Sequence, residues 1–329
     1  VVPYPGLRPF HPNESTIFYG RTRHSEEIVQ RLKSSRFVAV IGGSGSGKSS
    51  LIRAGVIPRL RTYGIPEAGD LWIPLIVTPG TNPSTPDQTP ISRLARSFSA
   101  LLKSRGSTQE DDARVTEIGK VFRQEAGFER LLTTYASELA IPPDTNPNKA
   151  CVLFVIDQFE EVFHRSNDDV ADVRIFVERI VDHFFNAHRC CYLVLTMRSE
   201  YLNFCPSFLE LPDIINRSSY LVPRLDNDDL REAIVEPPHI LLRYLRRQAT
   251  EVATLPSEVN FSADVIERIL ADTKKLTADP DHLPLLQHLL SRIWQVACVR
   301  QGPSTKAPES IIRDDLEQAV SATPLIKQS

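Results

Sequence analysis

One stretch near the start of the chain combines residue types that can hold phosphate. An apolar run leads into a loop that fits the pattern G-x-x-x-x-G-K-[ST], formed by Gly42, Gly43, Ser44, Gly45, Ser46, Gly47, Lys48 and Ser49, and followed by Ser50. Glycines let backbone N–H groups surround phosphate oxygens, and a helix that begins here directs its N-terminus at the negative charge. In such a loop Lys48 would contact the β- and γ-phosphates, and the Ser49 hydroxyl would bind Mg²⁺. The stretch therefore predicts a site for a nucleoside triphosphate.

Carboxylates follow another apolar run, CVLFVI at 151–156. Asp157 comes directly after it and is expected to orient Mg²⁺, most simply through a bound water. Glu160 and Glu161 follow three and four residues later, and either carboxylate could polarise an attacking water. The sequence does not decide between them, although we place Glu160 slightly ahead. The alternative is that both are first-turn residues favoured by a helix dipole.

An arginine ends a third apolar run. Arg198 follows CCYLVLTM at 190–197 and, in a parallel sheet, would lie on the same edge as the phosphate loop. A guanidinium there could read the γ-phosphate or stabilise charge during transfer. The alternative is a surface salt bridge, for instance with Glu200.

Alternating strands and helices must position these residues. Continuous apolar runs predict buried parallel strands at 36–41, 72–77, 151–156, 190–197 and 218–223. Helical spacing predicts helices at 48–60, 91–103, 128–140 and 170–187, with a loop at 78–90 and an exposed insertion at 104–117. The expected fold class is α/β, a P-loop NTPase with a parallel sheet sandwiched by helices. After Pro223 strands are expected to cease, and helices at 226–236, 262–272 and 282–299 would form a helical subdomain.

The bulk composition excludes some classes of protein. The chain has 329 residues and a formal net charge of −3, so its net charge does not indicate electrostatic binding to nucleic acid or to an anionic membrane. No apolar stretch approaches the length of a membrane span, and no signal peptide is visible. The chain does not begin with Met, which favours a fragment of a longer protein. Its five cysteines form no CxxC pair, which is typical of reduced thiols and a cytoplasmic location. Near His188, Cys190 and Cys191 are interpreted as buried thiols instead of metal ligands.

Several segments, in order along the chain, carry a resemblance to a known family. They are PYPGLRPF at 3–10, FYGR at 18–21, GGSGSGKSSLIRAGVIPRL at 42–60, VIDQFEEVF at 155–163, LTMRSEYL at 195–202, LVPRLDNDDLREAIVEPP at 221–238 and LPLLQHLLSRIW at 283–294. Together they resemble the first novel STAND group of STAND-class NTPases. The resemblance implies that 155–163 is the Walker B segment and 195–202 a sensor segment.

The resemblance also implies an adenine pocket. By it, the residues that line the pocket are Phe18, Tyr19, Gly20 and Arg21. Pro284 matches the proline of a G-x-P motif that packs near the base, although His282 stands in the glycine position. From the residues alone, 18–21 could be an exposed turn that caps a helix, and Pro284 a proline at a helix start.

The chain is expected to be the nucleotide-dependent core of a longer protein, divided into four parts. They are an N-terminal adenine-pocket segment at 1–35, the P-loop NTPase α/β domain at 36–223, a helical subdomain at 224–308 and the start of a winged-helix domain at 309–329. The resemblance implies ATP/ADP with Mg²⁺, homo-oligomerisation on activation, an effector domain upstream and a sensor region downstream.

The leading functional hypothesis is a slow or regulated ATPase switch that controls oligomerisation and effector activation in signalling or anti-phage defence. The alternative is an AAA-like motor or remodeller that acts on protein or nucleic acid, with Arg189, Arg217 or Arg224 available to a neighbouring subunit. A small-molecule kinase is a third hypothesis, against which stand the large helical region and the lack of an obvious acceptor or lid motif. Fast basal turnover by the isolated chain would count against a switch.

Overall fold

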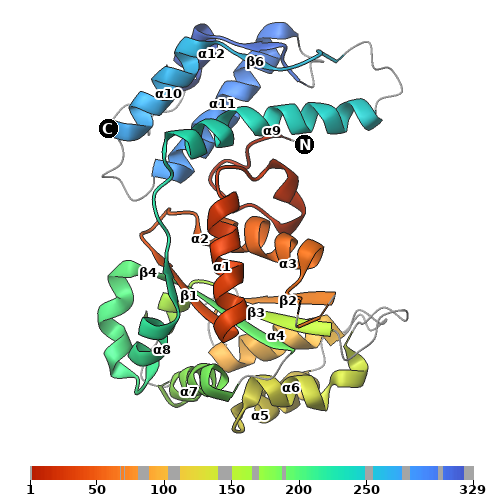
Figure 1. Cartoon of the computed structure of the whole chain (residues 1–329), viewed down its shortest axis with the longest axis vertical. Coiled ribbons are helices and arrows are strands. Elements are labelled where there is room, and N and C mark those ends of the chain that lie inside the picture. Colours follow the sequence, from red (N-terminus) through yellow and green to blue (C-terminus); the bar gives the residue numbers. More distant parts are fainter. Residues whose placement is uncertain are drawn as a thin grey trace. The chain divides into compact units, whose positions relative to one another are not determined.

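The computed structural model describes residues 2–66, 68–69, 71–80, 89–102, 112–139, 150–164, 170–186, 190–248, 255–275, 282–302 and 307–321 (Figure 1). Its contacts divide the chain into two compact units. Val1–Ser25, Ser44–Gly55 and Pro223–Ser329 make up the helical unit, and Glu26–Gly43 with Val56–Val222 make up the sheet unit.

The sheet unit is built on one parallel sheet of five strands, in the order β2-β3-β4-β1-β5. The strands are β1 (Phe37–Gly42), β2 (Leu71–Val77), β3 (Ala150–Ile156), β4 (Cys191–Arg198) and β5 (Ser219–Leu221). Every residue of β1 and β3 is buried, as expected of parallel strands covered on both faces. The predicted α/β class with a parallel sheet is thereby confirmed.

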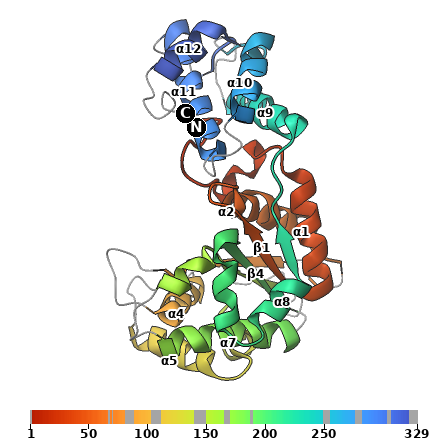
Figure 2. The same ribbon diagram turned by 90° about the vertical axis from the view of Figure 1, so that its left-hand side faces the viewer.

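Helices α4 to α7 lie together against this sheet (Figures 1 and 2). The helices of the unit are α4 (Pro90–Leu102), α5 (Asp112–Arg123), α6 (Gly127–Thr134), α7 (Val170–Asn186) and α8 (Leu211–Arg217). Their apolar faces share a core with the strands, in which Phe122, Phe128 and Phe154 are fully buried. The prediction of an exposed insertion at 104–117 is wrong from Asp112 onward, where α5 begins. Val115 is buried in α5, and buried residues recur at every third or fourth position after it, as in a helix that packs one face against a core. The rest of that insertion lies outside the described residues.

Two further helices straddle the boundaries between the units in sequence. α1 (Thr22–Ser35) precedes β1, and a continuous helical stretch follows the phosphate loop. That stretch consists of α2 (Lys48–Ser50), a π-helical turn (Leu51–Val56) and α3 (Ile57–Tyr63). A π-helical turn inside a helix often occurs at a functional site.

The helical unit has a separate hydrophobic core. Its helices are α9 (Asn227–Gln248), α10 (Ala263–Lys275), α11 (His282–Gln301) and α12 (Arg313–Ser321). The prediction that strands cease after Pro223 is wrong, because β6 (Asn260–Phe261) pairs in parallel with β7 (Ser310–Ile311). Leu316 and Ala319 of α12 join the same core as α10 and α11. The winged-helix start at 309–329 stays a prediction, since 322–329 lie outside the described residues.

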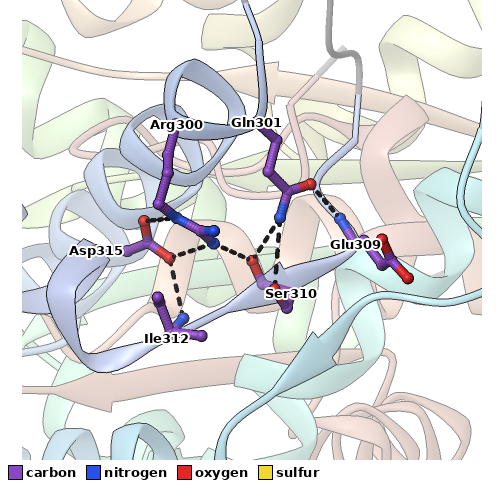
Figure 3. A network of polar contacts seen from close by, with 6 residues as sticks. All are labelled: Arg300, Gln301, Glu309, Ser310, Ile312 and Asp315. Atoms are coloured by element: carbon purple, nitrogen blue, oxygen red, sulfur yellow. Dashed lines mark hydrogen bonds and ion pairs between the residues drawn. The ribbon is translucent and has the colours of Figure 1, made fainter.

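A polar network fixes β7 and the start of α12 to the end of α11 (Figure 3). Arg300 Nε and Nη2 donate to the Asp315 carboxylate at 2.8 and 3.0 Å, and Nη2 also donates to the Ser310 carbonyl at 2.8 Å. Asp315 accepts the Ile312 N–H at 2.9 Å, which caps α12. Asp315 is 1% exposed, so its charge is buried and paired. Among the described residues, no helix is long and apolar enough to cross a membrane.

Candidate functional site

The carboxyl ends of three neighbouring strands in the sheet unit gather the polar residues predicted from sequence. In the register of β1 and β4, Gly42 lies opposite Arg198. β3 pairs with β4 on its other side, and Asp157 follows the last residue of β3. The first glycine of the phosphate loop therefore lies beside Arg198, as the sequence predicts for a parallel sheet.

Asp157 is held by the neighbouring strand. The Thr196 hydroxyl donates to the Asp157 carboxylate at 2.7 Å, and the Gln158 N–H donates to the same hydroxyl oxygen at 2.9 Å. The Asp157 N–H donates to the Val77 carbonyl of β2 at 2.8 Å. Asp157 is 2% exposed, so its orientation at this sheet edge is fixed by contacts. Thr196 was not predicted, although a hydroxyl within the apolar run LVLTM is a signal that could have found it.

Glu160 and Arg198 form an ion pair. Arg198 Nε lies 3.2 Å from Glu160 Oε1, and the Arg198 N–H donates to Glu160 Oε2 at 3.3 Å. The Glu160 side chain is 7% exposed, whereas that of Arg198 is 44% exposed. The partner of Arg198 is thus Glu160 instead of Glu200, whose carboxylate lies 3.4 Å from the Ser199 hydroxyl. Two residues that the sequence proposed separately act on each other.

Glu161 contacts a different loop. Its carboxylate accepts the backbone N–H of Gly80, just after β2. Burial, and next the charge of Glu160, raises the pKa of Glu161. A Cβ atom at Gly80 would collide with the Glu161 carboxylate, so only glycine allows this approach. The role of Gly80 was not predicted, because it depends on which loop meets the turn after β3.

The phosphate loop itself belongs mostly to the helical unit. Gly45 and Gly47 have φ of +63° and +85°, a backbone conformation that strongly favours glycine. The Leu51 N–H donates to the Gly47 carbonyl at 2.8 Å, which starts the helix after the loop. Lys48 Nζ lies 3.5 Å from the Ser46 hydroxyl. A Cβ atom at Gly43 would meet nothing within 4 Å, so the backbone is open at this position.

Arg21 contacts the backbone of this loop. Its guanidinium donates to the Ser46 carbonyl at 3.2 Å and to the Pro223 carbonyl at 2.7 Å, and the residue is 4% exposed. Arg21 therefore positions the phosphate loop, and it also bonds to the Ser25 N–H in the first turn of α1. The Phe18 ring packs edge-on against Phe10 at 5.1 Å. The adenine pocket at these positions stays a prediction.

The neighbouring residues Tyr19 and Gly20 face α9. Burial, and next the charges of Glu236 and Glu232, raises the pKa of Tyr19. Gly20 has φ of +77°, and its N–H donates to the Glu232 carboxylate. These contacts place the segment FYGR between the phosphate loop and α9 within the helical unit.

Pro284 lies in the first turn of α11, where a proline costs no helical hydrogen bond. A Cβ atom at Gly47 would lie 3.9 Å from the side chain of Leu283. The start of α11 is therefore next to the phosphate loop, as a contact of Pro284 with a bound base would need. That contact stays a prediction.

A buried cluster elsewhere in the sheet unit contains metal-ligating residue types. In the described part of the chain, ligand atoms of Glu129, His183 and Cys191 lie within 4.8 Å of one another. His183 Nδ1 lies 2.8 Å from Glu129 Oε1, and Nε2 lies 3.4 Å from the Arg36 carbonyl. Both ring nitrogens thus have hydrogen-bond partners, whereas Glu129 Oε2 is buried without one among the described residues. His188 lies outside the described residues.

Each unit by itself carries residues of the kinds that bind a nucleotide with Mg²⁺. In the helical unit the loop supplies glycines in the left-handed conformation and Lys48 supplies a cation, and in the sheet unit Asp157 is a fixed carboxylate at the carboxyl edge of the sheet. A parallel sheet whose first strand runs into such a loop, with an acidic residue after another strand, defines a P-loop NTPase. The chain belongs to the novel STAND NTPase 1 family, whose model matches residues 3–309. Membership implies binding of a nucleoside triphosphate.

Solved structures show the same fold at low identity. The chain is similar to the ORC1 protein of Aeropyrum pernix in complex with DNA, with a TM-score of 0.54 and 15% identity, over 94% of this chain and 67% of that one. It is also similar to the ORC2 protein of the same organism in its ADPNP–ADP complexes, with a TM-score of 0.51 and 13% identity, over 92% of this chain and 68% of that one. No curated protein matches the chain significantly in sequence.

Proposed function

We propose that this chain is the core of an ATP-dependent switch that hydrolyses ATP slowly or under regulation. The observation that carries the proposal is the ion pair of Arg198 with Glu160, at the sheet edge where β1 enters the phosphate loop. A switch needs a contact that differs between ATP and ADP. Arg198 is half-exposed and held by a single carboxylate, so a γ-phosphate could compete with Glu160 for the guanidinium, whereas ADP has no group to do so.

The residues have separate parts in this proposal. Ser49 and Asp157 would hold Mg²⁺, which when bound neutralises phosphate charge. Lys48 binds the phosphates, and Arg198 senses the third of them. When Arg198 turns to the phosphate, Glu160 loses its partner and becomes a candidate to accept a proton from water. Glu161 is the other candidate, because its pKa is raised above the ordinary value of a glutamate, which makes its carboxylate a better proton acceptor than an ordinary one.

Partners and setting extend the proposal. Homo-oligomerisation on activation, an effector domain upstream, a sensor region downstream and a cytoplasmic role in signalling or anti-phage defence remain the hypotheses that the family resemblance supplies. Of the arginines considered for a neighbouring subunit, Arg217 packs over the Phe185 ring at 5.8 Å, and Arg189 lies outside the described residues.

The alternative is an AAA-like motor or remodeller. It is supported by the similarity to the ORC1 protein in complex with DNA, at the level of the fold. Turnover separates the two functions. A switch would hydrolyse ATP slowly as an isolated chain, whereas a motor would turn over fast and respond to DNA or a protein substrate.

Binding of nucleotide is tested by Lys48→Ala. Loss of the β/γ-phosphate contact is expected to abolish ATP binding in titration calorimetry. Lys33→Ala removes the same charge from an exposed position on α1 and is expected to bind ATP like the wild type. An unchanged ATP affinity of the Lys48→Ala variant would contradict the assignment of the site.

A further inference from the structure

One backbone carbonyl of α9 lacks its helical hydrogen bond and accepts one from Tyr4 instead. In an α-helix each carbonyl accepts the N–H four residues later. The carbonyl of Ile234 faces Pro238, which has no N–H to donate. The Tyr4 hydroxyl donates to this carbonyl, and Tyr4 is 1% exposed. Burial also raises the pKa of Tyr4 well above its ordinary value, so the hydroxyl keeps its proton.

A second anchor lies at the other end of the N-terminal strap, which we define as residues 4–21. The Gly20 N–H donates to the Glu232 carboxylate. A Cβ atom at Gly20 would collide with the carbonyl of Asp229 and lie 3.4 Å from Ala233. The strap is therefore fixed to α9 near both of its ends, at Tyr4 and at Gly20.

Other residues of the strap bond to the phosphate loop and to α2, which follows it. The Phe10 N–H donates to the Ser50 hydroxyl at 3.2 Å, and Arg21 donates to the Ser46 carbonyl at 3.2 Å. Phe10 also packs with Ala54 of the helix after the loop, in a small cluster that includes Ile240 of α9. Figure 1 shows the strap, in red, between α2 and α9.

Ser46 and Ser50 flank the two residues that would meet the phosphates and Mg²⁺, Lys48 and Ser49. A change of loop backbone on phosphate binding therefore moves the acceptors of two strap hydrogen bonds. We propose that the strap couples the phosphate loop to α9, and that Tyr4 is the positioning residue that anchors it there. The coupling rests on the proposed function for its ligand, and it is reciprocal, since a stabilised α9 must favour the bound loop.

Hydrogen exchange on the full chain tests the coupling, with and without Mg²⁺–ADP or a non-hydrolysable ATP analogue. In the wild type, nucleotide is expected to slow exchange in the phosphate loop and in α9. In Tyr4→Phe the loop is expected to respond as before, while the response of α9 falls by about fivefold or more. The matched control is Tyr244→Phe, which removes a hydroxyl from an exposed residue of α9, where it accepts a hydrogen bond from the Gln248 side chain at 2.6 Å.

A second variant separates coupling from stability. Pro238→Ala gives α9 an N–H for the Ile234 carbonyl, so in the Tyr4→Phe background it is expected to restore the melting temperature but not the response of α9. A response that returns together with stability would overturn the proposal, as would a Tyr4→Phe protein whose α9 responds like the wild type. A wild-type loop that responds while α9 does not would overturn the coupling alone. No response in either segment of the wild type would overturn the proposed function as well.

Discussion

Arg198 and Glu160 bind each other across the carboxyl ends of β4 and β3, with 3.2 Å between Arg198 Nε and Glu160 Oε1. The pair is asymmetric, because the carboxylate is nearly buried and the guanidinium is half-exposed. A buried carboxylate that loses its counter-charge is costly. An exchange of partners by Arg198, as proposed for the γ-phosphate, therefore requires a new contact that compensates for that loss, and a charged phosphate oxygen is an acceptor of this kind.

Arg198→Ala is expected to weaken ATP more than ADP. Loss of a charged hydrogen bond to the γ-phosphate costs about 1.5–3 kcal/mol, which is about 10- to 150-fold in affinity. Calorimetry with ADP and a non-hydrolysable ATP analogue measures the difference. Arg217→Ala is the control, because Arg217 packs over the Phe185 ring. Equal losses for both nucleotides would argue against γ-phosphate sensing.

Glu160→Gln and Glu161→Gln are expected to keep nucleotide binding, and at least one is expected to slow hydrolysis. General-base catalysis contributes about 10²- to 10⁴-fold, so the slower variant should lie in this range. Single-turnover hydrolysis of ATP measures it. Glu200→Gln is the control, since its carboxylate contacts the Ser199 hydroxyl outside the ion pair. If both variants hydrolyse ATP at the wild-type rate, neither carboxylate polarises water.

The sheet could be predicted from sequence because its strands are continuous apolar runs. Four of the strand predictions agree with the structure to within one residue at each end, as for 72–77 against Leu71–Val77. The short pair β6 and β7 could not be predicted in the same way. Each has two residues, and their partners are 50 positions apart, as for Asn260 and Ser310, so neither gives a periodic signal.

In the candidate site, too, some residues could be predicted from sequence and others could not. Positions after strand ends, such as Asp157 and Arg198, follow from chain order and the parallel sheet. Their partners do not, because they depend on register and on loop paths. Thr196 reaches Asp157 only through the pairing of β3 with β4, and Gly80 meets Glu161 only because the loop after β2 comes beside the turn after β3.

Glu161→Gln is expected to raise thermal stability near neutral pH. Folding raises the pKa of Glu161, so the protonated form is favoured in the folded state and ionisation opposes folding. The stabilising contribution is complete below the unfolded pKa of about 4.3 and is lost as pH rises through the folded pKa. Glutamine has no such loss, and its carbonyl oxygen can still accept the Gly80 N–H. The gain in melting temperature over the wild type should therefore be larger at neutral pH than in mild acid, and an equal gain at both would contradict this account.

Arg300→Ala is expected to destabilise the helical unit by about 3 kcal/mol, because it leaves the carboxylate of Asp315 buried without its counter-charge. Denaturation followed by Trp294 fluorescence measures the loss, in a Trp72→Phe background so that the core of the helical unit alone reports. Arg313→Ala breaks an exposed ion pair with Glu317 in α12 and is expected to change little. Adding Asp315→Asn to Arg300→Ala removes the unpaired charge and should recover part of the loss, since Asn can still accept the Ile312 N–H. If the double variant is no more stable than Arg300→Ala, packing of the arginine side chain, and not the buried charge of Asp315, sets the stability of this network.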